Sequence, residues 1–214
     1  MHGIFITGSD TNVGKTYIGC QIANTLNKHG IKVIPRKPIE TGCTLVNGIL
    51  QPHDAQLLLS ASKAELSLDE VCPYRYQPAV SPHIAATKAT MTQAKILTSA
   101  LNNSLTLSNL VNACRYEEKE GGFLIVEGAG GIYSPICEHA LNADLAIALK
   151  LPIVLVVKDK LGAINQSLLA VNAAQQQQLN IHAIVLTNHQ NTIEHESLNN
   201  AAEIRKYTQH AVYN

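Results

Sequence analysis

Five short apolar runs, recurring between longer amphipathic stretches, constrain the fold of this 214-residue chain more than any other feature. They are rich in Ile, Val and Leu, and they occupy Gly3–Thr7, Lys32–Arg36, Phe123–Glu127, Ile153–Val157 and Ala183–Thr187. Strands that are apolar on both faces are typical of a sheet that is covered by helices on both sides. The sequence therefore predicts an α/β fold with a doubly wound, mainly parallel sheet, and a single domain over residues 1–214 accommodates it.

The stretches between these runs supply the expected helices. We expect them at Lys15–His29, Asp54–Ser62, Thr92–Glu117, Ala143–Lys150, Ala163–Leu179 and Glu194–Tyr207. A further helix begins at Ser81-Pro82, where a capping hydroxyl precedes proline at the first helical position. The prolines within Pro73–Pro82 predict a loop before it.

Composition narrows the possible functions. Lys+Arg and Asp+Glu number 16 each, so there is no net basic field to attract nucleic acid or anionic lipid. No apolar run reaches the roughly 18 residues of a membrane span, and the N-terminus resembles neither a signal nor a transit peptide. The five scattered cysteines form no C-x-x-C pair, which argues against a disulfide framework and a zinc site. We expect a cytoplasmic protein whose partners are neither nucleic acid nor membrane.

A glycine-rich loop lies between the first expected strand and the first expected helix. Residues 8–16 read Gly-Ser-Asp-Thr-Asn-Val-Gly-Lys-Thr. Gly14 permits a tight turn, Lys15 can reach outer phosphates, and the Thr16 hydroxyl can bind Mg²⁺. Five residues rather than four separate Gly8 from Gly14, so the loop is a longer variant of the phosphate-binding P-loop. A Gly-Lys-Thr tripeptide can also be a simple helix cap, but this position favours a nucleoside triphosphate and a fold of the P-loop NTPase type.

Three charged residues can complete such a site. Glu127 ends a buried strand and Asp54 opens a helix, so both are candidate Mg²⁺ ligands, although Asp54 can equally be a helix N-cap. The residues Gly128-Ala129-Gly130-Gly131 after Glu127 let the backbone approach a ligand closely. Lys37 follows the second strand, at the same sheet edge as the P-loop, where it can neutralise charge during phosphoryl transfer. We expect Lys37 to serve charge and not packing, so its replacement by alanine should leave folding intact.

Six sequence blocks follow one another along most of the chain. They are Thr7–Thr11 with Val13–Thr16, Lys37–Gly42, Asp54-Ala55, Pro73-Tyr74 with Ser81–Ala86, Val126–Gly131, and Leu161–Asn165. In this order, and with the unusual P-loop length, they resemble the dethiobiotin synthetase family. The resemblance implies that CO₂ carboxylates one amine of 7,8-diaminopelargonate and that the γ-phosphate of ATP activates the carbamate. The second amine then closes the dethiobiotin ring, releasing ADP and phosphate.

The resemblance also implies a role for individual residues. The nucleotide would be bound by Asn12, Val13, Gly14, Lys15, Thr16, Tyr17, Asp54, Glu127, Gly128, Ala129, Gly130 and Asn188, the last at adenine. Mg²⁺ would be held by Thr16, Asp54 and Glu127, and the catalytic groups would be Lys37 and Lys15. The diamine or carbamate end of the substrate would contact Thr11 and Thr41. Its distant carboxylate would be bound across a homodimer boundary by Leu161, Gly162 and Asn165.

The chain departs from the family pattern in a few places. Position 41 is Thr where serine is common, and position 12 is Asn where an acidic residue often stands. In the family, a segment with glycine or proline usually closes over the base of the nucleotide. Neither residue follows Gly162 here, so the sequence leaves the choice of nucleotide open. The alternative is an ATPase switch of the partition or septum-positioning type, but the early signature lysine of such loops is replaced here by Ser9 or Asp10.

Overall fold

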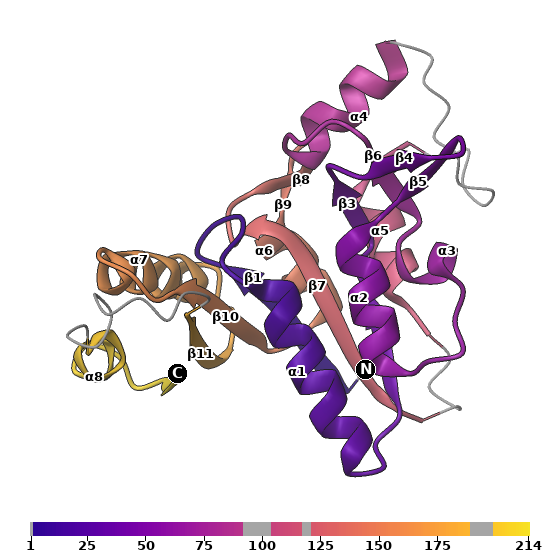
Figure 1. The fold of residues 1–214 in the computed structure, drawn as a ribbon. Helices are drawn as coiled ribbons and strands as arrows, with labels where there is room; N and C mark the ends of the chain where they lie inside the picture. Colours follow the sequence, from indigo (N-terminus) through magenta and orange to yellow (C-terminus); the bar gives the residue numbers. More distant parts are fainter. Residues whose placement is uncertain (1, 92–103, 117–120, 189–198) are drawn as a thin grey trace.

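A six-stranded parallel sheet with the order β12-β11-β10-β1-β7-β2 forms the centre of the computed structural model (Figure 1). The structure describes residues 2–91, 104–116, 121–188 and 199–214. The strands are β1 (Gly3–Gly8), β2 (Val33–Arg36), β7 (Phe123–Gly131), β10 (Ile153–Lys158), β11 (Ile181–Thr187) and β12 (Ala211–Tyr213). The predicted doubly wound α/β fold is confirmed, and β12 extends the sheet beyond the five expected strands.

Helices cover both faces of this sheet, as the apolar runs predict. One face packs against α1 (Lys15–Lys28) and α2 (His53–Ser62), in a core that includes Ile6, Leu58 and Val156. The opposite face packs against α5 (Leu107–Cys114), α6 (Asn142–Leu149) and α7 (Ala163–Gln176), and α8 (Asn200–Arg205) contacts α7. Alternate residues of each central strand therefore serve two different cores, which explains the continuous Ile, Val and Leu runs.

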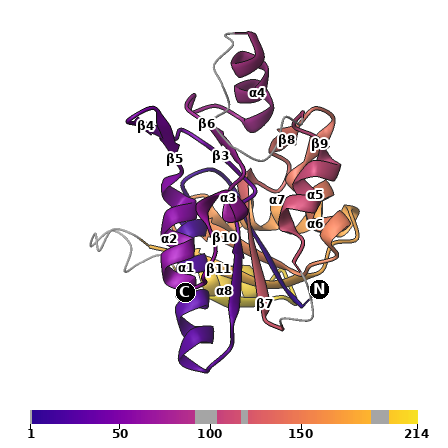
Figure 2. The ribbon, with the colours of Figure 1, turned by 90° about the vertical axis from the view of Figure 1, so that its right-hand side faces the viewer.

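Smaller elements gather at one end of the molecule, the upper end in Figures 1 and 2. They are the parallel pair β3 (Ile39–Thr41) and β6 (Tyr74–Tyr76), the hairpin β4 (Thr44–Val46) and β5 (Ile49–Gln51), the pair β8 (Pro135–Cys137) and β9 (Ala140–Leu141), and α4 (Pro82–Met91). The short helix α3 (Leu68–Val71) precedes β6. These additions surround the edge at which the central strands β1, β2 and β7 end.

Some expected boundaries need correction. Residues 92–103 and 117 of the helix expected over Thr92–Glu117 lie outside the described residues. In the described part, this helix begins only at Leu107, because the Thr106 hydroxyl accepts the N–H of Asn109 at 3.3 Å as an N-cap. The helix expected over Glu194–Tyr207 is described only as α8, and residues 189–198 lie outside the described part.

The loop expected over Pro73–Pro82 is interrupted by β6, which pairs with β3 and so satisfies its backbone through a segment distant in sequence. The helix expected after Ser81 is confirmed as α4. Within the described residues, no helix is long and apolar enough to cross a membrane.

Candidate active site

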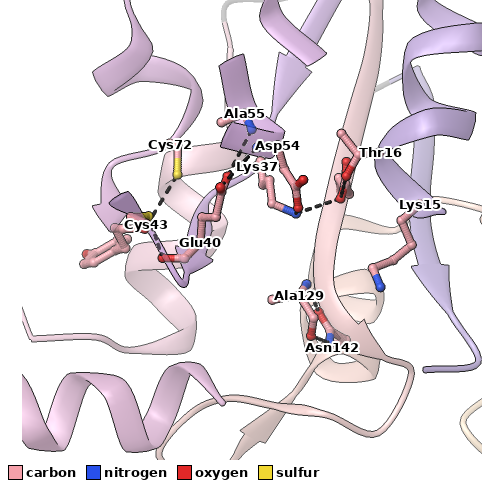
Figure 3. Close-up of polar contacts among 12 residues, drawn as sticks. Lys15, Thr16, Lys37, Glu40, Cys43, Asp54, Ala55, Cys72, Ala129 and Asn142 are labelled. Atoms are coloured by element: carbon pink, nitrogen blue, oxygen red, sulfur yellow. Dashed lines mark hydrogen bonds and ion pairs between the residues drawn. The ribbon is translucent and has the colours of Figure 1, made fainter. Parts of the chain in front are cut away.

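The candidate site lies where three neighbouring strands end at the same edge of the sheet. The strands β1, β7 and β2 are adjacent and parallel. The P-loop follows β1, and Lys37 comes directly after β2. Glu127 is the middle residue of β7 and does not end the strand as expected, because β7 continues to Gly131 beside β1. The first turn of α2 brings Asp54 to the same place (Figure 3). Topology therefore gathers residues that are up to 112 positions apart in the chain, from Lys15 to Glu127.

A cleft of about 360 Å³ opens between these elements. Its predicted lining residues are Thr11, Asn12, Gly14, Lys15, Thr16, Lys37, Thr41, Asp54, Glu127, Ala129 and Gly130, and Ile39 and Glu40 also line it. The cleft contains two cationic and three acidic side chains, together with the hydroxyls of three threonines. This combination suits a highly charged ligand better than an apolar one.

The P-loop is shaped by two residues with left-handed backbone. Asn12 has φ 56° and Gly14 has φ 94°, values that asparagine and glycine adopt more readily than other residues. The loop is also fixed from both ends. The Lys15 ammonium donates to the Asp10 carbonyl at 3.0 Å, and the Thr187 hydroxyl at the end of β11 donates to the Val13 carbonyl. The turn therefore leads directly into the N-terminus of α1, where partial positive charge favours phosphate.

Lys37 is the centre of a buried ion network. Its Nζ lies 2.7 Å from Glu127 Oε1 and 3.2 Å from Asp54 Oδ2. The Thr16 hydroxyl donates to the same Glu127 oxygen at 2.8 Å (Figure 3). Lys37 is only 3% exposed and Glu127 is fully buried. The expectation that Lys37 serves charge without contributing to folding does not fit this burial.

Burial and neighbouring charges shift the pKa values of these groups in different directions. Burial lowers the pKa of Lys15 to about 8, and the nearby charge of Lys37 adds to this effect. Burial also acts to lower the pKa of Lys37, but Glu127 and Asp54 outweigh it and raise that pKa above its ordinary value. For Asp54, burial acts to raise the pKa, whereas Lys37 and the Thr16 hydroxyl hold it below its ordinary value. Lys37 and Asp54 therefore stay charged over the neutral range.

The oxygen atoms around Lys37 also fit a divalent cation. Glu127 Oε2 is buried and has no hydrogen-bond partner, and the oxygens of Thr16 and Asp54 lie nearby. All three residues offer oxygen, which Mg²⁺ prefers. In the part of the chain that the structure describes, no cluster of three or more His, Cys, Asp or Glu side chains could hold a metal by itself. The residues fit a cation that completes its shell with water and phosphate, as Mg²⁺ usually does.

Two buried residues that support the site were not among those predicted. Glu40 accepts the backbone N–H groups of Asp54 and Ala55 at 3.1 and 3.0 Å. Asn142 donates to the carbonyls of Ala129 and Gly131 at 2.6 and 2.9 Å and accepts the Ala129 N–H at 3.2 Å. Glu40 lies inside the Lys37–Gly42 block, where its charge was a usable signal. Asn142 follows no motif, and only the folded chain reveals its position.

Other predicted residues lie outside the cleft lining. Val13 is buried beneath the loop, Tyr17 is exposed on α1, and Gly128 packs against Asn142 and Phe5. Exposed positions are also occupied by Leu161, Gly162 and Asn165 around the start of α7, and by Asn188 after β11. Within one chain, these residues therefore do not join the group around Lys37.

Comparison with known proteins identifies close relatives. A family model described as "AAA domain" matches residues 2–213. The ATP-dependent dethiobiotin synthetase BioD of Vesicomyosocius okutanii subsp. Calyptogena okutanii is 45% identical over 97% of this chain and 87% of its own length. The enzyme of the same name from Ruthia magnifica subsp. Calyptogena magnifica is 42% identical over 97% of this chain and 88% of its own length. A third, from Anaeromyxobacter dehalogenans, is 33% identical over 97% of this chain and 86% of its own length.

Solved structures of lower identity share the fold. The signal recognition particle receptor FtsY from Elizabethkingia anophelis superposes with a TM-score of 0.55 at 14% identity, over 99% of this chain and 57% of that chain. The MinC:MinD cell division protein complex of Aquifex aeolicus gives a TM-score of 0.55 at 14% identity, over 99% of this chain and 79% of that chain. These likenesses show a common fold. The sequence relatives go further, and this chain belongs to the family of ATP-dependent dethiobiotin synthetases.

Proposed function

We propose that this chain is an ATP-dependent ligase that carboxylates 7,8-diaminopelargonate and closes the ring of dethiobiotin. The observation that carries the proposal is the buried Lys37, paired with Asp54 and Glu127 beside a P-loop. It occurs in a chain that is 45% identical to a named dethiobiotin synthetase. The co-substrates are ATP and CO₂ or bicarbonate, and the other products are ADP and phosphate.

The proposed reaction has three bond-forming steps. One amine of the substrate adds to CO₂, loses a proton and becomes a carbamate. A carbamate oxygen then attacks the γ-phosphorus of ATP, ADP leaves, and a carbamic–phosphoric anhydride forms. The second amine attacks the anhydride carbonyl, loses a proton and expels phosphate, which closes the ring. A carbamate is a weak nucleophile that readily loses CO₂, so the protein must hold two anions together rather than supply a strong base.

The two lysines suit this task because they differ in how firmly they hold their protons. The carboxylates around Lys37 raise its pKa, so it carries positive charge throughout the neutral range. We assign to it the neutralisation of the carbamate and of the phosphoryl oxygens during transfer. Lys15, whose pKa burial lowers to about 8, gains stabilisation of its charged form when a triphosphate binds. We propose that Lys15 binds the outer phosphates of ATP.

We assign Mg²⁺ to the oxygens of Thr16, Asp54 and Glu127. The unpartnered Oε2 of Glu127 and the all-oxygen donor set support this assignment. When bound, Mg²⁺ would neutralise charge on the phosphate oxygens. The hydroxyl of Thr16 and the carboxylate of Asp54 are already held near Glu127 and Lys37, so the chain pre-arranges its ligands.

The remaining assignments concern the substrate, the adenine and the oligomer. Thr11 and Thr41 line the cleft and are proposed to contact the diamine or carbamate end. We propose a homodimer in which Leu161, Gly162 and Asn165 at the start of α7 bind the distant carboxylate of the partner's substrate. Leu161 is 87% exposed, and the helix N-terminus that follows it suits an anion. Asn188 is proposed to contact adenine.

The test is direct synthesis by the purified chain. ATP, MgCl₂, ¹³C-bicarbonate and 7,8-diaminopelargonate are mixed with the protein, and dethiobiotin is measured by mass spectrometry. We expect labelled dethiobiotin and an equal amount of ADP, and neither product when the diamine is omitted. ATP hydrolysis that ignores the diamine but responds to DNA or lipid vesicles would instead favour the ATPase-switch function and refute the proposal.

A further inference from the structure

Glu40 borders the cleft, yet the proposed function gives it no role. It is the middle residue of β3, between Ile39 and Thr41, and it is 6% exposed. A carboxylate is seldom buried to this extent unless its oxygens are hydrogen-bonded or paired with a cation. The partners of Glu40 therefore indicate what it does.

Both oxygens of Glu40 accept hydrogen bonds from the first turn of α2. The Asp54 N–H donates to Oε1 at 3.1 Å, and the Ala55 N–H donates to Oε2 at 3.0 Å. The helix has no side-chain cap of its own, because its N-cap residue is Pro52. A residue 14 positions earlier in the chain thus supplies the anionic cap that a helix N-terminus favours.

The same helical turn carries the Asp54 side chain. Figure 3 shows the Glu40 carboxylate directed toward the backbone at Ala55, whereas the Asp54 carboxylate is directed toward Lys37. Fixing the backbone at residues 54 and 55 therefore limits where the Asp54 carboxylate can lie. Glu40 is next to Thr41, which is proposed to contact the substrate. Its hydrogen bonds to α2 therefore connect Thr41 to Asp54, the proposed metal ligand.

Glu40 also interacts electrostatically with Lys37 and Asp54. Burial raises the pKa of Glu40 and the nearby charge of Asp54 raises it further, while Lys37 and the two backbone N–H groups lower it. Glu40 in turn helps Glu127 and Asp54 to raise the pKa of Lys37. Its carboxylate is therefore close enough to the ion network to affect it, and it does so from the side of β3.

We infer that Glu40 is a positioning residue, which holds the first turn of α2 against β3 and thereby sets the place of the Asp54 carboxylate beside Lys37 and Glu127. The affinity of the cleft for Mg²⁺ together with ATP then depends on Glu40, although Glu40 itself binds neither. The part of this inference that concerns Mg²⁺ rests on the proposed function, which assigns Asp54 to the metal.

The test variant is Glu40→Gln, which keeps the size of the side chain. Its amide can accept one of the two N–H groups but presents an NH₂ donor to the other. We expect the Mg²⁺ concentration for half-maximal ATP binding, measured by calorimetry, to rise about tenfold, as when an outer-shell partner of a metal ligand is lost. ATP binding in EDTA should stay unchanged. Hydrogen exchange of the Asp54 and Ala55 amides, followed by NMR, should become faster.

Glu70→Gln is the matched control. Glu70 caps the neighbouring helix α3 by accepting the Ser67 N–H at 2.7 Å, and it lies outside the cleft lining. Its replacement should leave the Mg²⁺ dependence of ATP binding unchanged. If Glu40→Gln accelerates amide exchange at the start of α2 but keeps the Mg²⁺ dependence of the unmodified chain, Glu40 is only a helix cap and the inference fails.

Two further measurements cover the other outcomes. If Glu40→Gln does not fold, Glu40→Asp keeps the charge on a shorter side chain that cannot span both amides, and the same shift in Mg²⁺ dependence is expected. Rapid exchange of the Asp54 and Ala55 amides in the unmodified chain would overturn the inference without any variant. These binding measurements need no diamine. Failure of the unmodified chain to make dethiobiotin would thus refute the proposed function separately.

Discussion

Replacing Lys37 with methionine should destabilise the protein in a pH-dependent way. Methionine keeps much of the length of the side chain but removes the ammonium, which lies 2.7 Å from Glu127 and 3.2 Å from Asp54. Lys37 and Glu127 are both almost fully buried. Removing one partner of a buried ion pair costs about 3–5 kcal/mol of unfolding free energy, because the other charge is left uncompensated.

The pH dependence follows from the carboxylates. In the unmodified chain, Lys37 holds the pKa of Asp54 below its ordinary value, so that stabilising contribution is present above the unfolded pKa of about 4 and is lost as the pH falls through the folded value. In the variant, burial without the Lys37 ammonium raises the pKa of a carboxyl group, so protonation relieves the penalty as the pH falls. The loss of stability should therefore be large at about pH 8 and smaller at about pH 5.5.

Urea denaturation of both proteins at these two pH values, followed by circular dichroism, measures the effect. Lys206→Met is the matched control, because Lys206 Nζ also lies 2.7 Å from a carboxylate oxygen, that of Glu203, but on the surface. We expect no measurable loss for this control. A Lys37→Met variant as stable as the unmodified chain, or one with equal losses at both pH values, would refute the reasoning.

Three other outcomes are expected. Because burial lowers the pKa of Lys15 to about 8, ATP affinity should fall by up to about tenfold for each pH unit above that value, and calorimetry in two buffers should detect proton uptake on binding. An affinity that stays constant to about pH 9.5 contradicts this. Thr16→Ala should weaken the Mg²⁺ dependence of ATP binding while Thr16→Ser preserves it, and identical metal titrations would exclude the assigned hydroxyl ligand. Asn142→Leu should lower the unfolding free energy by roughly 3 kcal/mol, since it leaves buried backbone groups at Ala129 and Gly131 unpaired. Urea denaturation checks this, and unchanged stability would show that the end of β7 does not depend on Asn142.

Features encoded by short sequence patterns could be predicted. The five central strands are continuous apolar runs because the sheet is covered on both faces, and a glycine-rich turn between strand and helix marks the P-loop. Strand order then brings Lys37 and Glu127 together, as a parallel sheet requires. The edge strand β12 was missed because it has three residues and only Val212 is buried.

Features that depend on contacts between distant segments could not be predicted. The strands β3 and β6 stabilise each other across more than thirty residues, and neither has a pattern of its own. Asn142 acts on the end of β7, whose last residue, Gly131, lies 11 positions earlier in the chain. The burial of Lys37 is another such case, because a lysine after a strand is ordinarily solvated. Its two carboxylate partners, from β7 and α2, make the buried position favourable.

The left-handed turn at Asn12 limits how this loop can evolve. Glycine, asparagine and aspartate adopt positive φ with little strain, whereas valine, isoleucine and threonine strongly resist it. A library of all twenty amino acids at position 12, selected for growth without added biotin, should return mainly those three. Backbone geometry, with charge as a secondary matter, would then decide which side chains this position accepts.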